Sequence, residues 1–235
     1  MNLNDKFLLE KLPKIAEEQL NTKISDLKFI GGGSFGFTRK LVRDILTFPA
    51  FRDAEIALMD IDPDRLDRIA VACQKIIDAM EKPAKVTTTL SRAEALTNAD
   101  GVLCTVFNGG IDIWRHDIEI PKKYGIDINV GDTRSVSGIF RALRTIPVLD
   151  DFAKDMAEVC PKALFLNYTN PMAILAGYMQ RYTPIETVGL CHSVQVCSNT
   201  LLKEVGLEPK RPIREKIAGI NHMAFLLELE DADGN

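Results

Sequence analysis

A cysteine and a histidine stand side by side in the segment GLCHSVQ, directly after a short apolar run. Both side chains can bind metals or transfer protons. Neighbouring residues on extended chain point to opposite sides, so Cys191 and His192 are not expected to hold one ion together. A second ligand is available in AGINHMAF, where His222 lies among apolar residues and its imidazole needs a partner. Cys191 with His222 is therefore a candidate metal site with open positions; the alternative is a buried structural cysteine with a hydrogen-bonded histidine.

Glycines in the segment IGGGSFGF have the spacing G-x-G-x-x-G, at Gly31, Gly33 and Gly36. Between a strand and a helix this spacing predicts a dinucleotide-binding turn, whose helix start, with Ser34 and Phe35, offers backbone N–H groups to phosphates. Gly31 is expected to permit the tight turn, Gly33 to let a pyrophosphate approach, and Gly36 to let helix and strand pack closely. A glycine-rich structural loop is the alternative.

The acid that completes this pattern is Asp60, at the end of the next predicted strand in IALMDIDPDRL. A carboxylate there can bind the ribose hydroxyls, which favours NAD over NADP. A helix-capping role is the alternative for such an acid. It applies better to Asp62, which directly precedes Pro63 and is expected to be the N-cap of the following helix.

Apolar runs alternate with helical patterns, which is typical of a parallel sheet covered by helices. The predicted strands are residues 27–30, 54–59, 85–89, 101–106, 163–167 and 186–190. Apolar residues at steps of three and four predict helices over 38–48, 63–80 and 138–160, with a break or kink at Pro147. The fold class is therefore α/β, a Rossmann-like, doubly wound, mostly parallel sheet.

Three parts of the chain are predicted from these patterns. Residues 1–26 form a helical extension, residues 27–191 an NAD-binding Rossmann-like domain, and residues 192–235 the start of a second, α+β region for substrate and metal, which we expect to be truncated. Within LNYTNPM, Asn170 follows a strand end where ligands bind in such sheets, or caps the next helix.

Arginines on the predicted helix 138–160 leave two interpretations open. Arg141 and Arg144 are either solvated or salt-bridged, or they face the cleft.

Composition excludes several classes of protein. Of the 235 residues, 46% are apolar and 26% charged, and the formal net charge is -4, which favours neither disorder nor a nucleic-acid surface. No stretch reaches the roughly 18 apolar residues of a membrane span, and the first residues do not resemble a signal peptide. Five scattered cysteines are typical of reduced thiols, so we expect a cytoplasmic protein.

Six segments together resemble glycoside hydrolase family four, the NAD- and manganese-dependent glycosidases: IGGGSFGFTRKLV, IALMDIDPDRL, GIFRALRTIPV, LNYTNPMAIL, VGLCHSVQ and AGINHMAFLLELE. The CHSV and GINHMAF versions resemble the α-galactosidase (melibiase-like) branch. The resemblance implies a divalent metal, usually manganese, on Cys191 and His222. It also implies that His192 is the substrate-side acid for the leaving group, and that Asn170 contacts substrate near the nicotinamide.

The resemblance also implies a mechanism outside the usual two-carboxylate scheme. NAD oxidises carbon 3 of an α-galactoside or α-glucoside, a base removes the proton on carbon 2 with metal assistance, the aglycone is eliminated, water adds, and NADH returns the hydride. The family's base is a tyrosine well downstream of the metal histidine, and a homo-oligomer is usual. Two alternatives stay open: an NAD-dependent 2-hydroxy acid dehydrogenase, and a non-catalytic NAD-binding module.

Overall fold

A computed structural model describes residues 26–128, 133, 135–208 and 212–234. The predicted helical extension lies outside the described residues, except for Asp26, which begins the first strand. The chain forms two compact units, residues up to 106 with 158–164, and residues 107–157 with 165–235. These units are defined by which residues lie close together in space. The predicted division into a cofactor domain, residues 27–191, and a substrate region, residues 192–235, is a division by function and stays a prediction.

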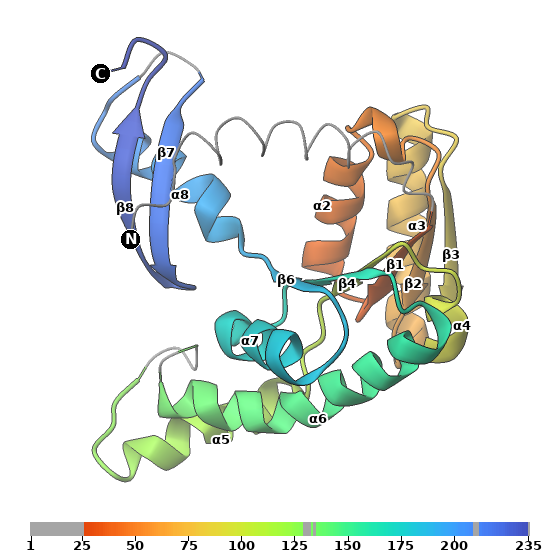
Figure 1. The fold of residues 1–235 in the computed structure, drawn as a ribbon, viewed down its shortest axis with the longest axis horizontal. Coiled ribbons are helices and arrows are strands. Elements are labelled where there is room, and N and C mark those ends of the chain that lie inside the picture. The colour runs from red at the N-terminus through yellow and green to blue at the C-terminus, as the bar shows by residue number, and fades with distance from the viewer. Residues whose placement is uncertain (1–25, 129–132, 134, 209–211, 235) are drawn as a thin grey trace. The chain divides into compact units, whose positions relative to one another are not determined.

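Six strands form one sheet in the order β3-β2-β1-β4-β5-β6 (Figure 1). They are β1 (Asp26–Ile30), β2 (Glu55–Met59), β3 (Lys85–Thr89), β4 (Gly101–Cys104), β5 (Leu164–Asn167) and β6 (Thr187–Gly189). β1 pairs with β2 and β4, β2 with β3, and β5 with β6, all in parallel. β4 is buried over its whole length, as expected for a strand covered on both faces. The predicted Rossmann-like fold class is confirmed.

The helices of the first unit are α2 (Phe35–Ile45), the short 3-10 helix η1 (Pro49–Phe51), α3 (Pro63–Ala79) and α4 (Arg92–Leu96). The predicted N-cap of α3 is confirmed, because the Asp62 side chain accepts a hydrogen bond from the Arg65 N–H at 3.1 Å and Pro63 is the first helical residue. α2 begins three residues before the predicted start at residue 38. The glycine turn therefore leads directly into a helix N-terminus.

The second unit contains α5 (Gly110–Lys122), α6 (Val136–Val159), α7 (Met172–Tyr182) and α8 (His192–Glu204). The apolar pattern of α6 was recognisable in the sequence, whereas no helix was predicted for α5 or α8. Pro147 does not end α6, which runs through it. Side chains on both sides of the proline are buried, among them Thr145 and Leu149.

A two-stranded antiparallel hairpin, β7 (Arg214–Ile220) and β8 (Met223–Glu230), forms the small second sheet. The segment AGINHMAFLLELE, which reads as one strand, is divided by a tight turn at Asn221 and His222. The reason is the backbone of His222, whose φ of 61° lies in the left-handed region that reverses the chain.

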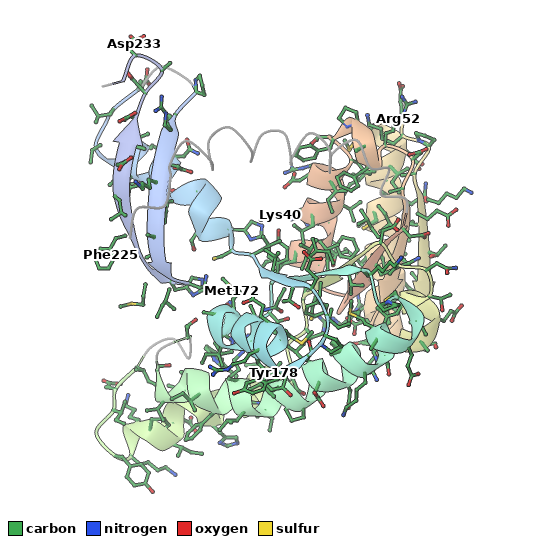
Figure 2. All side chains as sticks on the ribbon, viewed as in Figure 1. Lys40, Arg52, Met172, Tyr178, Phe225 and Asp233 are labelled. Carbon is green, nitrogen blue, oxygen red and sulfur yellow. The ribbon has the colours of Figure 1, made fainter. Side chains whose placement is uncertain are left out.

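Apolar side chains are exposed along the hairpin. Phe225 is 71% exposed and extends from β8 in Figure 2. An isolated two-stranded hairpin is marginally stable in water, so its anchoring to other elements matters. One anchor is a hydrogen bond from the Ser198 hydroxyl of α8 to the Glu215 carboxylate of β7. This bond ties the hairpin to the helix that begins next to Cys191.

Candidate cofactor turn and cation site

Gly31 and Gly33 occupy positions where a β-carbon would come too close to neighbouring atoms. Gly31 has a φ of 78°, and a β-carbon there would lie 2.9 Å from the carbonyl carbon of Thr105. The Thr105 hydroxyl donates to the Gly31 carbonyl at 2.9 Å. At Gly33 a β-carbon would lie 2.6 Å from Oδ2 of Asp60. Gly31 is therefore required by the local backbone, whereas a side chain at Gly33 would have to displace the Asp60 carboxylate.

Asp60 closes this turn from the end of β2. Its Oδ2 accepts a hydrogen bond from the Gly33 N–H at 2.9 Å, and its Oδ1 accepts from the N–H groups of Ile61 and Asp62 at 2.9 and 3.2 Å. The carboxylate is 8% exposed. The fold thus brings together the two halves of the dinucleotide pattern, 27 residues apart, while ribose binding by Asp60 stays a prediction.

The packing role expected for Gly36 is wrong. Gly36 is exposed, and a β-carbon there would meet no atom of a described residue within 4 Å. The close approach occurs instead at Gly32, where a β-carbon would lie 3.1 Å from the β-carbon of Leu58. Ser34 is half-buried and Phe35 is 54% exposed. The start of α2 therefore keeps open space beside backbone N–H groups that have no carbonyl partner within the helix.

Replacing Gly33 with alanine is expected to weaken NAD binding at least about tenfold, because the new methyl group must displace the Asp60 carboxylate and stand where a pyrophosphate would approach. Isothermal titration of NAD into both proteins measures the effect. Gly177→Ala is the matched control, since Gly177 lies inside α7 and a β-carbon there meets no atom within 4 Å. Equal affinity in Gly33→Ala and the natural protein would contradict the assignment.

Cys191 lies after the end of β6 and is the N-cap of α8. Its Sγ accepts from the Ser193 N–H at 3.4 Å and lies 3.2 Å from the Ser193 hydroxyl oxygen. Gly189 at the end of β6 has no side chain, and the sulfur of Met172, labelled in Figure 2, occupies the space of a β-carbon there. Cys191 is thus held at a helix N-terminus, where partial positive charge favours an anionic sulfur.

His222 lies beside this sulfur. Its Nε2 is 3.3 Å from Cys191 Sγ, although the two residues are 31 positions apart. Cys191 is partly exposed and His222 is exposed, so the cysteine is not buried as that alternative expects, while the hydrogen-bonded histidine of the same alternative is present. Burial has the largest single influence and raises the pKa of Cys191. Hydrogen bonds from Ser193, Asn221 and His222 together outweigh it, so the pKa is lowered from the ordinary value.

The turn residue His222 adopts a conformation that costs free energy for any residue with a β-carbon. We expect His222→Gly to stabilise the hairpin by about 1 kcal/mol relative to His222→Ala, since both variants lose the imidazole and only glycine relaxes the backbone. Amide exchange in β8 should then be about fivefold slower in the glycine variant. Neither variant should bind a divalent cation at the site. Equal exchange rates in the two variants would disprove the strain.

His192 and Asn170 are the two residues for which the resemblance implies a role toward the substrate. His192 is the first residue of α8, and its ring centroid is 5.5 Å from that of Tyr168. Asn170 Oδ1 accepts from the Met172 N–H at 3.3 Å, although the N-cap of α7 is Pro171, so Asn170 contacts the first helical residue from one position before the cap. Ligand contact by Asn170 and proton donation by His192 stay predictions.

The surroundings of Arg144 decide between the alternatives left open for this arginine. It forms a bidentate ion pair with Asp117 of α5, with N–O distances of 2.9 and 2.6 Å, and the Asp117 side chain is 5% exposed. The hydrogen bond to Asp117 raises the pKa of Arg144. Arg141 lies over the ring of Phe107, 4.8 Å from its centroid. The salt-bridged interpretation is confirmed for Arg144.

Two contacts of the Cys191 sulfur were missed from the sequence, those of Ser193 and Asn221. Asn221 directly precedes His222, and Ser193 stands two residues after a helix-capping cysteine, so the spacing offered a signal for both. Within the described ranges no three His, Cys, Asp or Glu side chains gather in metal-binding geometry. A thiolate with an imidazole is a donor pair that suits divalent transition metals, so Cys191 and His222 fit such a cation and leave positions open.

Residues 26–207 match the sequence model of the family described as "Family 4 glycosyl hydrolase". The chain belongs to this family. It is 48% identical to an alpha-galactosidase of Bacillus subtilis (strain 168) over 87% of its own length and 47% of the relative's. It is 41% identical to an alpha-galactosidase of Rhizobium meliloti (strain 1021), over 86% of its length and 41% of the relative's. The family 4 chain thus spans less than half the length of these relatives.

Solved structures show the same fold. A 6-phospho-alpha-glucosidase from gut microorganisms, in complex with NAD and Mn2+, superimposes with a TM-score of 0.78 at 21% identity, over 91% of this chain and 49% of that one. A lactate dehydrogenase from Eimeria maxima superimposes with a TM-score of 0.59 at 15% identity, over 88% of this chain and 56% of that one. At these identities the likeness concerns the fold alone.

The five cysteines of this family 4 chain are expected to differ sharply in reactivity. Cys73, Cys104 and Cys160 are buried, and burial raises the pKa of Cys73 to about 11. Cys197 is exposed and Cys191 is partly exposed with a lowered pKa. A chromogenic disulfide reagent near neutral pH should therefore modify two thiols in the native protein and five in denaturant. Three or more fast thiols in the native protein would contradict this assignment.

Proposed function

We propose that this chain supplies the cofactor- and cation-binding part of an NAD- and manganese-dependent α-galactosidase. The observation that carries the proposal is the approach of His222 Nε2 to Cys191 Sγ, 3.3 Å apart, in a family 4 chain that is 48% identical to an alpha-galactosidase. The B. subtilis and R. meliloti relatives favour an α-galactoside over the α-glucoside alternative. The complex of the gut 6-phospho-alpha-glucosidase with NAD and Mn2+ supports the choice of cofactors.

The glycine turn would hold the dinucleotide. Backbone N–H groups at the start of α2, near Ser34, Phe35 and Gly36, donate to phosphate oxygens, and Gly33 admits the pyrophosphate because it has no side chain. Asp60 keeps lone pairs for ribose hydroxyls, since its present hydrogen bonds use only part of its accepting capacity. An acid at this position repels a 2′-phosphate, which favours NAD over NADP.

Cys191 and His222 would hold the cation, one through a thiolate and the other through Nε2. When bound, NAD supplies a reversible hydride acceptor for sugar carbon 3, and the cation supplies Lewis-acid stabilisation for the oxygens on carbons 2 and 3. The Ser193 N–H would orient the sulfur for this task, and the hydrogen bonds of Ser193 lower the pKa of Cys191.

His192 would donate a proton to the glycosidic oxygen as the aglycone leaves, since an imidazole transfers protons near neutral pH. The ring of Tyr168 restricts the orientation of this imidazole. Asn170 would contact a sugar hydroxyl through the part of its amide that does not contact Met172. The resemblance assigns removal of the carbon 2 proton to a tyrosine well downstream of the metal histidine.

We also propose a cytoplasmic homo-oligomer that acts on a small carbohydrate. The support for the compartment is that the five cysteines, all among the described residues, form no disulfide, and that one of them belongs to the candidate cation site. Among the described residues no helix has the length and hydropathy of a bilayer span.

Release of p-nitrophenol from p-nitrophenyl α-galactoside tests the proposal, with NAD, manganese and a thiol reductant each omitted in turn. Hydrolysis that requires all three supports it, and faster turnover of the α-galactoside than of the α-glucoside supports the choice of sugar. Hydrolysis that survives removal of NAD and chelation of metals would overturn it.

A non-catalytic NAD-binding module is the second candidate, because the chain spans 47% and 41% of the two α-galactosidases it matches. Binding of NAD with no hydrolysis under any of these conditions would favour it. The dehydrogenase alternative rests only on the fold shared with a lactate dehydrogenase at 15% identity, and the family match gives it no support.

A further inference from the structure

Arg65, in the first turn of α3, lies against the glycine turn. Its Nε donates a hydrogen bond to the Gly33 carbonyl at 3.4 Å, across 32 positions of the sequence. A β-carbon at Gly33 would lie 3.0 Å from the β-carbon of Arg65, so the two residues come close together here. The Arg65 N–H donates to the capping carboxylate of Asp62 at 3.1 Å. The backbone of this arginine and the Nε of its side chain are therefore both held beside the turn.

The guanidinium of Arg65 has donors to spare. A guanidinium carries five N–H groups, and only the one on Nε has a partner among the described residues. The side chain is exposed, so the four terminal N–H groups are accessible to a ligand. An arginine with a purely structural role at this turn would need only its Nε. The remaining donors are therefore available for a molecule that the turn itself binds.

Asp60 and Arg65 hold the same glycine from two sides. The Gly33 N–H donates to Oδ2 of Asp60 at 2.9 Å, and the Gly33 carbonyl accepts from Arg65 Nε. The turn thus brings a carboxylate that accepts hydrogen bonds close to a guanidinium that donates them. Both lie at the carboxyl end of β2, where the ribose of a dinucleotide binds in this fold.

Resting on the proposed function, we propose that Arg65 is a cofactor-binding residue. Its guanidinium donates to the 2′-hydroxyl of the adenosine ribose of NAD, while Asp60 accepts from the same ribose.

The chemistry of a ribose hydroxyl favours this pair over a contact of Arg65 with the pyrophosphate. The start of α2 already offers the pyrophosphate backbone N–H groups that have no carbonyl partner within the helix. In dinucleotide-binding folds, side chains beside the acid of the second strand contact the 2′ position of the ribose. A hydroxyl donates one hydrogen bond and accepts others, so it can donate to Asp60 and accept from Arg65. A carboxylate alone would leave the lone pairs of that hydroxyl without a donor.

The test measures cofactor binding by isothermal titration in the full chain, without sugar or metal. Arg65→Ala should bind NAD about tenfold more weakly than the natural protein, the loss expected for one hydrogen bond from a charged donor. ADP-ribose contains the adenosine half and lacks the nicotinamide, so its affinity should fall by the same factor. Arg68→Ala, an exposed arginine on the same helix, is the matched control and should bind both ligands normally. Circular dichroism and the unfolding midpoint show whether each variant is folded.

A second measurement separates contact with the ribose from support of the turn. The analogue of NAD with 2′-deoxyadenosine lacks the hydroxyl to which Arg65 would donate. The natural protein and Arg65→Ala should therefore bind this analogue with affinities within about twofold of each other. An arginine that only stabilises the Gly33 carbonyl would, when removed, weaken the binding of NAD and of the analogue by the same factor.

The outcomes distinguish this inference from the proposed function. Binding of NAD by the natural protein, together with unchanged affinity in a folded Arg65→Ala or an equal loss for NAD and the deoxy analogue, overturns the role of Arg65 and leaves the cofactor turn standing. Failure of the natural protein to bind NAD overturns both. A loss for NAD and ADP-ribose that disappears with the analogue supports the inference.

Discussion

Cys191→Ser should abolish manganese binding, with a loss of affinity greater than about hundredfold, because removing a ligand costs more than removing an outer contact. The hydroxyl of serine does not deprotonate near neutral pH, so it cannot replace a thiolate that lies 3.3 Å from His222 Nε2. His222→Ala should have an effect of the same order. Isothermal titration with manganese measures both losses.

The control for this result is Cys197→Ser, an exposed cysteine on the same helix. It should bind manganese like the natural protein. Manganese affinity that is unchanged in both Cys191→Ser and His222→Ala would remove the cation site from these residues. In that case the contact between the two side chains would be only a hydrogen bond at the start of α8.

The second large effect is expected on folding. Arg144→Met should lower the free energy of unfolding by about 3–5 kcal/mol, because it leaves the buried carboxylate of Asp117 without its bidentate partner. The variant also loses a hydrogen bond from Arg144 Nε to the Asn108 carbonyl. Urea unfolding followed by circular dichroism provides the measurement.

Two comparisons identify the cause of that destabilisation. In Arg144→Met with Asp117→Leu both charges are absent, and most of the stability should return because no unpaired ion is buried. Lys154→Met breaks an ion pair with Asp150, in which the lysine side chain is 67% exposed, and should leave the unfolding midpoint nearly unchanged. A double variant as unstable as Arg144→Met alone would show that packing, and not charge, is responsible.

Local sequence patterns were sufficient for much of the fold. The alternation of apolar runs and helical periodicity predicted all six strands of the parallel sheet. This was possible because the pattern that identifies a strand is contained in the strand's own residues. The N-cap at Asp62 was predictable for the same reason, because its partner Arg65 lies three residues away. The helix α5 escaped prediction because it begins at Gly109 and Gly110, residues that favour turns.

The sequence by itself determined which chemistry the chain can carry. It contains glycines spaced for a dinucleotide, an acid one strand later, and a cysteine and a histidine able to hold a cation. Only the tertiary structure decided that Cys191 Sγ and His222 Nε2 lie 3.3 Å apart. That outcome depends on a turn that divides one apolar run into β7 and β8, and on the anchoring of β7 to α8. Contacts across 31 residues arise from packing between elements, which the periodicity of a single element cannot encode.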